Sequence, residues 1–494
     1  MRKTVLYSLT LKGCLVAAGI FIAGCAGSTS KTEKRNPLAP VATTPLVQTP
    51  LAQKPVANQP LQLGRSGSAA ELHKDRARGL SSGQEPKKHV LDVSGAEVLH
   101  SAQAKRAWYT DTWASPLVYF NKQRFFVYVT DDLKAVVGSI SEKGEVRERE
   151  LEPGYSVTDD GHNEFSIGVD KEGFLHIAGD MHNNRFRYWR SKAPASIAGF
   201  HKLFDDIPNT TFSYYSFHRD QNDELYLTAR IQALDKYYVR GGRGVGLFKY
   251  DLASKRWRAR GALPNAKNAM HPVIFWQDSG QEGGSYQMYK TDIAFDKNNR
   301  MHISFTLNAD NAKHRHNYAV YAYSDDGGIT FQRSDNTILT LPLSLEQRSA
   351  TPDVLAGYKN ADLSEHASVF YDSANRPAVY FAKDGATYYR FLDAVEGVSK
   401  WSDPILIRTG ECERCRPFYS EYDSRFYISD GAQLYHGNAL GEPMRQVRLP
   451  APILRWERTL SSSANTAHKG LSGVSWDSKS GEWKIYFVPF KRQK

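Results

Sequence analysis

One pattern recurs along this chain and constrains its fold more than any other feature. An apolar run ends in Asp, two to four polar or glycine residues follow, and a second apolar run begins. The Asp position falls at Asp170, Asp220, Asp296, Asp372, Asp423 and Asp477, with a weaker copy at Asn121. Two strand-like runs around a turn of Asp, Asn and Gly indicate a β-hairpin. The sequence therefore predicts seven hairpins.

The spacing of these hairpins indicates how they assemble. Successive copies lie 49, 50, 76, 76, 51 and 54 residues apart. Periods near 50 are typical of a β-propeller, in which each repeat forms one four-stranded blade. The two longer intervals leave room for loops near 262–288 and 334–362. We therefore predict an all-β fold, a single seven-bladed propeller over residues 88–494, whose last blade is completed by the stretch from about Val90 to Tyr109.

The N-terminal residues indicate export. Three basic residues precede an apolar run, Leu15 to Ala23, which is too short to span a bilayer as a helix. The small residues just before Cys25 resemble the lipobox of bacterial lipoproteins. This resemblance implies a signal peptide over residues 1–24 and a lipid on the Cys25 thiol. The alternative is an ordinary cleaved signal with a chance cysteine.

Residues 25–87 have the composition of a tether. They are rich in Pro, Thr, Gln, Ala, Ser and Gly and carry almost no aromatic residue. Such a segment cannot bury enough apolar surface to offset its ordering entropy, so we predict disorder. With a lipid at Cys25 it would anchor the propeller to the cell envelope. Ala26 gives no inner-membrane retention signal, so we expect the outer membrane, on its periplasmic or its exposed side.

The net charge of +11 narrows the class of partner. A basic surface on an exported protein suits a polyanion, such as an acidic polysaccharide or anionic lipid. A solvated basic surface without a partner is the alternative. Nucleic acid is not expected outside the cell, and no nucleic-acid motif is present. We expect a monomer.

Polar residues gather where strand alternation predicts one rim of the propeller. The innermost strand of each blade precedes the repeat Asp and the second strand follows it, so the start of the first and the end of the second share a rim. At these positions in blades two and three stand His162, Asn163, His182, Asn183, Tyr214, Tyr215 and Arg230. Together such groups can hold an anion and move protons. Any one of the histidines could instead be a hydrogen-bonded loop residue, and His176 and His302, inside second strands, are expected to be packed within the sheet.

Cys412 and Cys415 are the thiols that remain once the signal is removed and Cys25 is lipidated. Their spacing lets both sulfurs face one ion, and His366 and His316 could complete a structural zinc site. A disulfide is the alternative in an oxidising compartment. Redox catalysis is not expected, because no thioredoxin-like βαβ pattern surrounds the pair.

The chain resembles a β-propeller family related to sialidase-type repeats, which includes the ulvan lyases of polysaccharide lyase families 24 and 25. The most specific segment is GHNEFSIGVDKEGFLHIAGDMHNNRFRYWRS, residues 161–191. Residues 211–230 and 316–331 resemble later family segments in the same order, and SDDGGITF (Ser324 to Phe331) resembles the turn-forming Asp box of sialidase-type propellers. The resemblance covers most of residues 90–490 and is closer to family 25.

This resemblance implies β-elimination at a uronic acid within ulvan, a sulfated polysaccharide of green algae. By position, the catalytic residues would be His162, His182, Tyr214 and Arg230. A guanidinium pairs with a carboxylate, a histidine can accept the C5 proton, and a tyrosine can act at the leaving oxygen. We expect Tyr214 and His162 to form the acid–base pair and His182 to orient the uronate.

The resemblance also implies supporting residues. Asn163, Asn183, Tyr215 and Arg243 are expected to bind substrate. Tyr215 stands where the family commonly has a proline, which leaves open which of the two adjacent tyrosines is catalytic. The family's zinc is structural, and Cys412 and Cys415 would fit as its ligands.

Two other functions remain open from the sequence. A sialidase-like glycoside hydrolase would need an arginine triad, a tyrosine nucleophile and an acid/base Asp, and we cannot assemble such a set here. A non-catalytic glycan-binding propeller at the cell surface would use the same arginines and aromatic residues.

Overall fold

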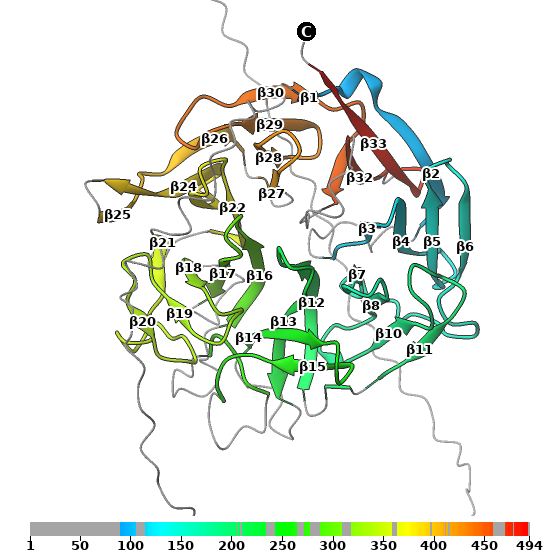
Figure 1. The fold of residues 1–494 in the computed structure, drawn as a ribbon, viewed down its shortest axis with the longest axis horizontal. Coiled ribbons are helices and arrows are strands. Elements are labelled where there is room, and N and C mark those ends of the chain that lie inside the picture. The colour runs from blue at the N-terminus through cyan, green and yellow to red at the C-terminus, as the bar shows by residue number, and fades with distance from the viewer. Residues whose placement is uncertain are drawn as a thin grey trace, which may run out of the picture. The chain divides into compact units, whose positions relative to one another are not determined.

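The repeated hairpins form the inner parts of seven antiparallel sheets, which are arranged around a central axis as the blades of a propeller (Figure 1). The structure is a computed structural model. It describes residues 89–492 except 105–113, 205, 208–209, 234–242, 264–270, 277–286, 309–317, 358–362, 396–397, 411, 413–414, 458–469 and 478. The predicted all-β, seven-bladed fold is confirmed. The predicted signal peptide (1–24), Cys25 and the tether (25–87) lie outside the described residues.

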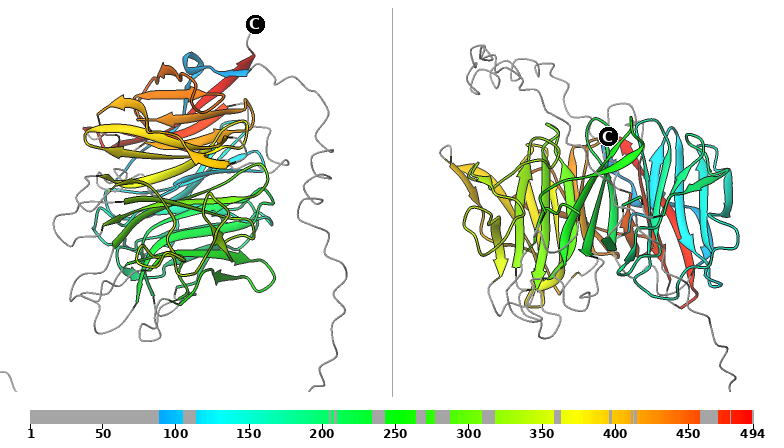
Figure 2. Two further views of the ribbon diagram at one scale, coloured as in Figure 1. Left: turned by 90° about the vertical axis from the view of Figure 1, so that its left-hand side faces the viewer. Right: turned by 90° about the horizontal axis from the view of Figure 1, so that it is seen from below.

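Blades one to three follow one another along the chain, each running outward from an innermost strand. Their strands are β3 (Leu117–Phe120), β4 (Gln123–Val129), β5 (Ala135–Ser141) and β6 (Val146–Glu150); β7 (Phe165–Val169), β8 (Leu175–Gly179), β10 (Tyr188–Ser191) and β11 (Phe200–Lys202); and β12 (Thr210–Arg219), β13 (Leu225–Ala233), β14 (Gly244–Asp251) and β15 (Arg256–Ala259), with the short β9 (Asn184–Arg185) paired to β12. The strands run from one face of the disc toward the other (Figure 2).

Blades four to six repeat the arrangement with extra short strands. They comprise β16 (Gln287–Phe295), β17 (Met301–Asn308), β18 (Tyr318–Ser324), β19 (Phe331–Gln332), β20 (Ile338–Leu339) and β21 (Asp353–Gly357); β22 (Leu363–Tyr371), β23 (Pro377–Lys383), β24 (Ala386–Val395), β25 (Val398–Trp401) and β26 (Ile405–Thr409); and β27 (Arg416–Ser420), β28 (Arg425–Ser429), β29 (Gln433–Gly437) and β30 (Arg445–Arg448).

Blade seven joins the two ends of the described chain. Its strands are β31 (Ile453–Trp456), β32 (Gly470–Trp476), β33 (Glu482–Arg492), β1 (His89–Leu91) and β2 (Glu97–Gln103), and a 3-10 turn, η1 (Val93–Gly95), lies between the last two. Both β1 and β2 pair with β33, with Leu91 opposite Phe490 and Gln103 opposite Glu482. The predicted closure is confirmed. Pairing the last strand with the first covers an edge that would otherwise stay open.

The repeat Asp shapes each hairpin turn. The Oδ1 of Asp220 accepts the backbone N–H groups of Asn222 (2.8 Å) and Glu224 (2.9 Å). The corresponding carboxylates of Asp296 and Asp372 accept from the residues two and four positions later. A side chain that replaces turn hydrogen bonds in this way explains why Asp recurs there.

Asn side chains then tie neighbouring turns together across blades. Asn299 donates from Nδ2 to Asp220 Oδ2 (3.3 Å), and its Oδ1 accepts from the backbone N–H of Gln221 (2.8 Å). Asn375 repeats both bonds one blade later, to Asp296 and Lys297. Asn299 and Asn375 have φ of 62° and 67°, a left-handed conformation that Asn tolerates better than most residues. We call these paired bonds the inter-blade latch.

The two histidines predicted to lie within sheets are buried, as expected. His176 contacts Asp170 Oδ2 through Nε2 (3.0 Å) and the Tyr188 hydroxyl through Nδ1 (2.6 Å). His302 contacts the Tyr321 hydroxyl through Nδ1 (2.7 Å). Both rings therefore join neighbouring strands of one blade and do not reach a rim.

The Asp box forms the turn between β18 and β19. Asp326 accepts from the backbone N–H of Ile329 (3.0 Å) and Thr330 (2.9 Å) and from the Thr330 hydroxyl (2.6 Å), while Ser324 donates to Asp326 (2.8 Å). Its carboxylate is fully used by this turn, so the motif shapes the fold and takes no part in chemistry.

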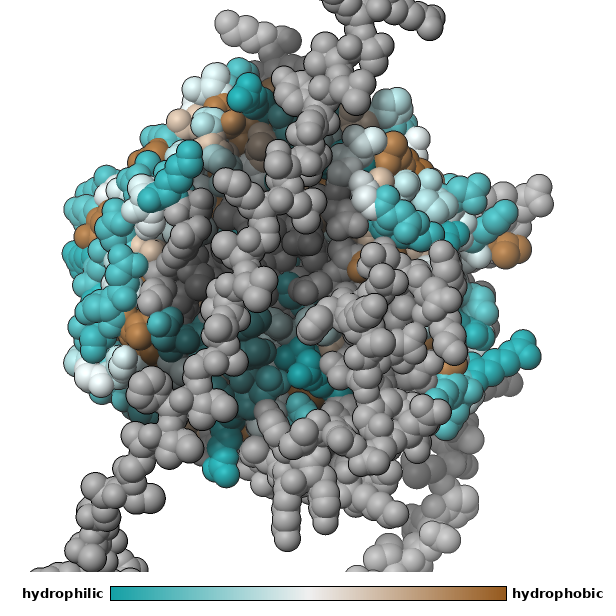
Figure 3. Space-filling view, turned by 180° about the vertical axis from the view of Figure 1, so that it is seen from behind, coloured by the Kyte–Doolittle hydropathy of each residue, from teal (hydrophilic) through white to brown (hydrophobic). Residues whose placement is uncertain are grey.

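The described parts of the two long excursions meet beside blades three and four. Phe275 forms bridges to Val245 and Leu343, and all three side chains are fully buried. Where described residues are visible from behind, the surface is mainly hydrophilic with small apolar spots (Figure 3). The described part of the chain contains no helix long and apolar enough to cross a membrane.

Candidate active site

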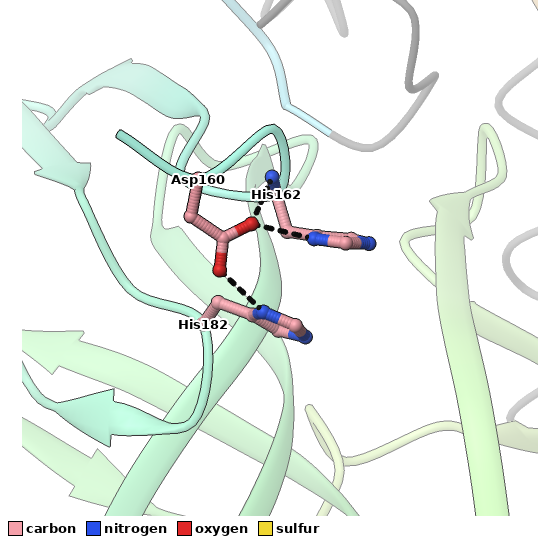
Figure 4. Close-up of side chains that lie close together, drawn as sticks. All are labelled: Asp160, His162 and His182. Carbon is pink, nitrogen blue, oxygen red and sulfur yellow. Dashed lines mark hydrogen bonds and ion pairs between the residues drawn. The ribbon is translucent and has the colours of Figure 1, made fainter. Parts of the chain in front are cut away.

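The two histidines of the sequence signature stack on each other at one rim of blade two. His162 precedes β7 and His182 follows β8, and their ring centroids lie 4.1 Å apart with an interplanar angle of 24° (Figure 4). The hairpin explains this meeting, because the start of its first strand and the end of its second lie at the same edge. The His162 side chain is 49% exposed and that of His182 is 23% exposed.

A carboxylate that the sequence argument missed lies between these rings and the chain. Asp160 Oδ1 is 2.7 Å from His162 Nδ1, and Asp160 Oδ2 is 2.8 Å from His182 Nδ1. The backbone N–H of His162 also donates to Oδ1 (3.0 Å). Partial burial tends to raise the pKa of Asp160, but these hydrogen bonds outweigh it and hold the pKa at about 2. Asp160 belongs to Asp-Asp-Gly, which reads as an ordinary turn; its place two residues before His162 was the available signal.

A second carboxylate, Asp180, fixes the loop that carries Asp160 and His162. It is 1% exposed and accepts from the Tyr155 hydroxyl, the backbone N–H of Thr158 (3.0 Å) and Asn163 Nδ2 (2.9 Å), and it forms an ion pair with Arg187. Asn163 itself is 1% exposed. The prediction that Asn163 binds substrate is therefore corrected: its Nδ2 is bonded to the loop and its Oδ1 is buried.

Tyr214 reaches the histidines because β12 is interrupted by a bulge. The pairing of β12 with β13 shifts between Ser213 and Ser216, and Tyr214 adopts a φ of 51°. Its ring centroid lies 6.2 Å from that of each histidine. A left-handed conformation in a non-glycine residue costs about 1–3 kcal/mol and is concentrated at functional sites.

The neighbouring Tyr215 points into the core. It is 2% exposed, and its hydroxyl donates to the backbone carbonyl of Glu164. The Glu164 side chain forms a buried ion pair with Arg455 of blade seven (2.8 Å). Tyr215 therefore supports the segment after His162, and the prediction that it binds substrate is corrected. Of the two adjacent tyrosines, Tyr214 is the one beside the histidines.

Arg230 lies against the face of Tyr214. Its Cζ is 4.3 Å from the Tyr214 ring centroid, its Nη2 donates to Asn183 Oδ1 (3.3 Å), and the side chain is 2% exposed. Burial, followed by the charge of Arg243, lowers the pKa of Arg230 to about 10. Its Nη1 has no hydrogen-bond partner among the described residues. Asn183 thus positions Arg230, and its backbone N–H donates to Ser213 Oγ (2.8 Å).

Blade four contributes two residues that the sequence argument missed. The rings of Tyr214 and Tyr289 stack at 5.7 Å between centroids, and Lys290 Nζ lies 5.5 Å from the Tyr214 ring. Both lie near the start of β16, the innermost strand of the blade. Lys290 stands six residues before its repeat Asp, the same offset as Tyr214, and β16 carries a bulge between Met288 and Thr291. That repeat offset was the signal that could have found it.

The charges at this site favour an anion over a metal ion. Asp160, His162 and His182 offer ligand atoms within 4.8 Å of one another, the one such group in the described part of the chain. Burial lowers the pKa of His182, the hydrogen bond to Asp160 opposes this, and the charge of Arg230 lowers it further. A cation at the imidazoles would meet that same repulsion. The nearby cations Arg230, Arg243 and Lys290 instead suit a carboxylate or sulfate.

The predicted zinc ligands do not form a metal site in this structure. Cys412 and Cys415 are joined by a disulfide with an S–S distance of 2.10 Å. A disulfide offers no thiolate to zinc, so the pair in this state, which is the alternative drawn from the sequence, does not fit the ion. His316 and the side chain of His366 lie outside what the structure describes. The zinc content of the protein stays a prediction.

Fold and site together define a class: a seven-bladed propeller in which blades two to four bring imidazole, phenol and guanidinium groups to one point. The sequence profile described as "BNR repeat-containing family member" matches residues 123–403, more than half of the chain. The chain belongs to the BNR repeat-containing family. No curated protein matches it in sequence.

Solved structures of polysaccharide lyases share this fold. An ulvan lyase of family 25 bound to -[GlcA(1-4)Rha3S]- has 11% identity and a TM-score of 0.57, over 79% of this chain and 95% of that chain. A second structure, described as a family 25 ulvan lyase, has 12% identity and a TM-score of 0.58, again over 79% of this chain and 95% of that chain. The polysaccharide lyase Uly1 gives 12% and 0.56, over 77% of this chain and 90% of its own. The resemblance to family 25 is thus confirmed, and at these identities it is a likeness of fold.

Proposed function

We propose that this protein is a polysaccharide lyase that cleaves a uronic-acid polysaccharide by β-elimination. The observation that carries the proposal is the stacked His162–His182 pair beside Tyr214, itself backed by Arg230. Each group suits a step of that reaction, and the four residues come from two neighbouring blades.

β-Elimination needs a base and an acid at adjacent carbons. The base removes the proton from C5 of the uronate, the C4–C5 double bond forms, and the C4–O bond breaks as its oxygen gains a proton. His162, the more exposed imidazole, would take the C5 proton, and the Tyr214 hydroxyl would protonate the leaving oxygen. His182, on the other side of the stack, would orient the uronate.

The same reaction needs positive charge at the carboxylate, because the C5 carbanion delocalises into it. Arg230 carries a buried charge with an unpaired Nη1 among the described residues, and a buried charge without an anionic partner is unfavourable. A uronate carboxylate drawn toward this guanidinium would supply that partner, and Arg243 and Lys290 would add to the field. This binding would be stronger in the transition state, where the charge on the carboxylate grows.

Ulvan is the substrate we propose within this class. Support comes from the fold shared with a lyase solved with a glucuronate–sulfated rhamnose ligand, and from the net charge of +11. We further propose that a lipid on Cys25 anchors the enzyme in the cell envelope, at the outer membrane. Growth with labelled palmitate, comparing wild type with Cys25→Ser, tests that anchor: label on the wild type alone supports it.

The activity is tested by incubating the protein with ulvan and, in parallel, with uronate-free polysaccharides. A lyase creates an unsaturated uronate, seen as ultraviolet absorbance and as product masses one water lighter than hydrolysis products. Unsaturated products from ulvan alone would support the proposal. Saturated products would point to a hydrolase, and binding without products would point to a glycan-binding propeller; either result would overturn it.

A further inference from the structure

The carboxylate of Asp160 is shared between the two imidazoles. Each of its oxygens holds one ring through Nδ1, at 2.7 Å for His162 and 2.8 Å for His182. Figure 4 shows the second nitrogen of each ring on the side away from Asp160. One side chain therefore orients both histidines at once.

The chemistry of a carboxylate decides where the hydrogens lie. An ionised carboxylate accepts hydrogen bonds and has none to donate. Asp160 remains ionised at neutral pH, because its hydrogen bonds keep its pKa at about 2. Both Nδ1 atoms must therefore carry the hydrogens, which leaves each neutral imidazole with its lone pair on Nε2.

The loop that carries Asp160 is itself held in place. The backbone N–H of His162 donates to Asp160 Oδ1 (3.0 Å), and the backbone N–H of Asn163 donates to the Asp160 carbonyl (2.9 Å). Asp180 fixes both ends of the same loop through Thr158 and Asn163. The carboxylate is thus placed by the fold before any substrate arrives.

We propose that Asp160 is a positioning residue of the lyase site: it holds His162 and His182 with Nδ1–H directed at its carboxylate, so that both Nε2 atoms face the substrate. The role in turnover rests on the proposed function. The role in orienting the rings does not, and it has its own measurement.

That measurement is the nitrogen NMR spectrum of the imidazoles in the wild-type protein, assigned with His162→Gln and His182→Gln. Recorded at a pH where the rings are neutral, the spectrum should show the hydrogen of both on Nδ1. A hydrogen on Nε2 of either ring would overturn the proposal. This readout needs no substrate, so it stands or falls separately from lyase activity.

Asp160→Asn sharpens the test because it keeps the shape and removes the charge. An amide offers one acceptor and one donor group, so one imidazole must move its hydrogen to Nε2. We expect that change in the spectrum and a KM within a few-fold of wild type. We also expect a loss of kcat of about 10- to 100-fold, the range found when the partner that orients a metal-bound histidine is removed. Unchanged imidazole signals and kcat would overturn the proposal.

Asp170→Asn is the matched control, since Asp170 also holds a histidine of blade two, the buried His176. This variant should lower the thermal midpoint and leave the signals of His162 and His182, and kcat, unchanged. A loss of kcat in Asp170→Asn equal to that in Asp160→Asn would show a general effect on the blade and contradict a specific role for Asp160.

Discussion

Arg230 and Tyr214 form a cation–π pair, with the guanidinium carbon 4.3 Å from the ring centroid, inside a stack that continues to Tyr289. The pair joins the second strand of blade three to the bulge in its first strand. Because the charge is almost fully buried, the ring and the guanidinium hold each other in place. The Tyr214 hydroxyl, which we propose as the general acid, is thereby fixed by the side chain that would also neutralise the substrate.

Tyr214→Phe removes the hydroxyl and keeps the ring on Arg230. We expect product formation to fall about a hundred- to ten-thousandfold, the usual effect of removing a general acid, with the fold retained. Tyr215→Phe is the control: it loses the bond to the Glu164 carbonyl, which should lower stability by about 1 kcal/mol and leave turnover intact. Equal losses of activity in both variants would contradict our choice of tyrosine.

Arg230→Ala should lower kcat/KM by at least about tenfold to a hundredfold, the effect of losing a charge-assisted hydrogen bond. KM should rise and kcat should fall, because the carboxylate is held in the ground state and more strongly in the transition state. Steady-state kinetics on ulvan measures this. Arg243→Ala, at a partly exposed position, should mainly raise KM. If Arg230→Ala retained wild-type kcat, the role assigned to the guanidinium would be wrong.

Glu457 should make stability depend on pH. Burial raises its pKa from 4.5 to about 7, despite the nearby charge of Arg124. The folded protein then keeps a proton that the unfolded chain releases, so the stabilisation is complete below pH 4.5 and is lost as pH rises through 7. A shift of this size corresponds to about 3 kcal/mol. Urea unfolding should show the loss, and Glu457→Gln should remove most of it. As a control, Glu142→Gln at an exposed position should leave the dependence of unfolding free energy on pH as in wild type. The same dependence in Glu457→Gln as in wild type would refute the role of Glu457.

Asn299→Ala breaks the inter-blade latch and places alanine at a φ of 62°. We expect about 1–3 kcal/mol of destabilisation from the lost hydrogen bonds and the strain. Asn299→Gly removes the same bonds while tolerating the conformation, so its loss should be smaller. Chemical denaturation of the two variants separates the cost of the lost hydrogen bonds from the cost of the backbone strain. Wild-type stability in both variants would show that the latch does not contribute to stability.

Cys412 and Cys415 should be found oxidised. Mass spectrometry of the unreduced protein should show the peptide that joins them two hydrogens lighter than its reduced form. Without a free thiolate at these positions, any zinc found by elemental analysis would have to be held elsewhere. Free thiols together with one equivalent of zinc would instead establish the metal site predicted from the sequence.

The parts of the molecule that the sequence predicted share one property: they depend on short-range patterns that repeat. The turn Asp and its two apolar runs determine the seven hairpins, and strand alternation then places His162 and His182 at one rim. The closure of blade seven followed from counting strands in the last repeat.

The parts that the sequence did not predict depend on departures from that alternation. Period-two reasoning cannot tell Tyr214 from Tyr215 when a bulge shifts the register between them, and here the bulge turns Tyr214 to the site and Tyr215 to the core. The loop that carries Asp160 and Asn163 could not be predicted either. The Asp160 carboxylate orients the histidines, whereas the Asn163 side chain is buried. This difference depends on the three-dimensional path of residues 155–163, which no sequence period describes.

The pairing of Leu91 with Phe490 allows the chain to be joined at its ends and opened elsewhere. The ring has no structural beginning, because its first and last strands are neighbours in one sheet. Joining residue 492 to residue 89 by a short linker and opening the chain at the exposed turn around Gly144 would preserve every strand pair of the propeller. Such a circular permutant should fold and retain the site on blades two to four, with its new ends on blade one.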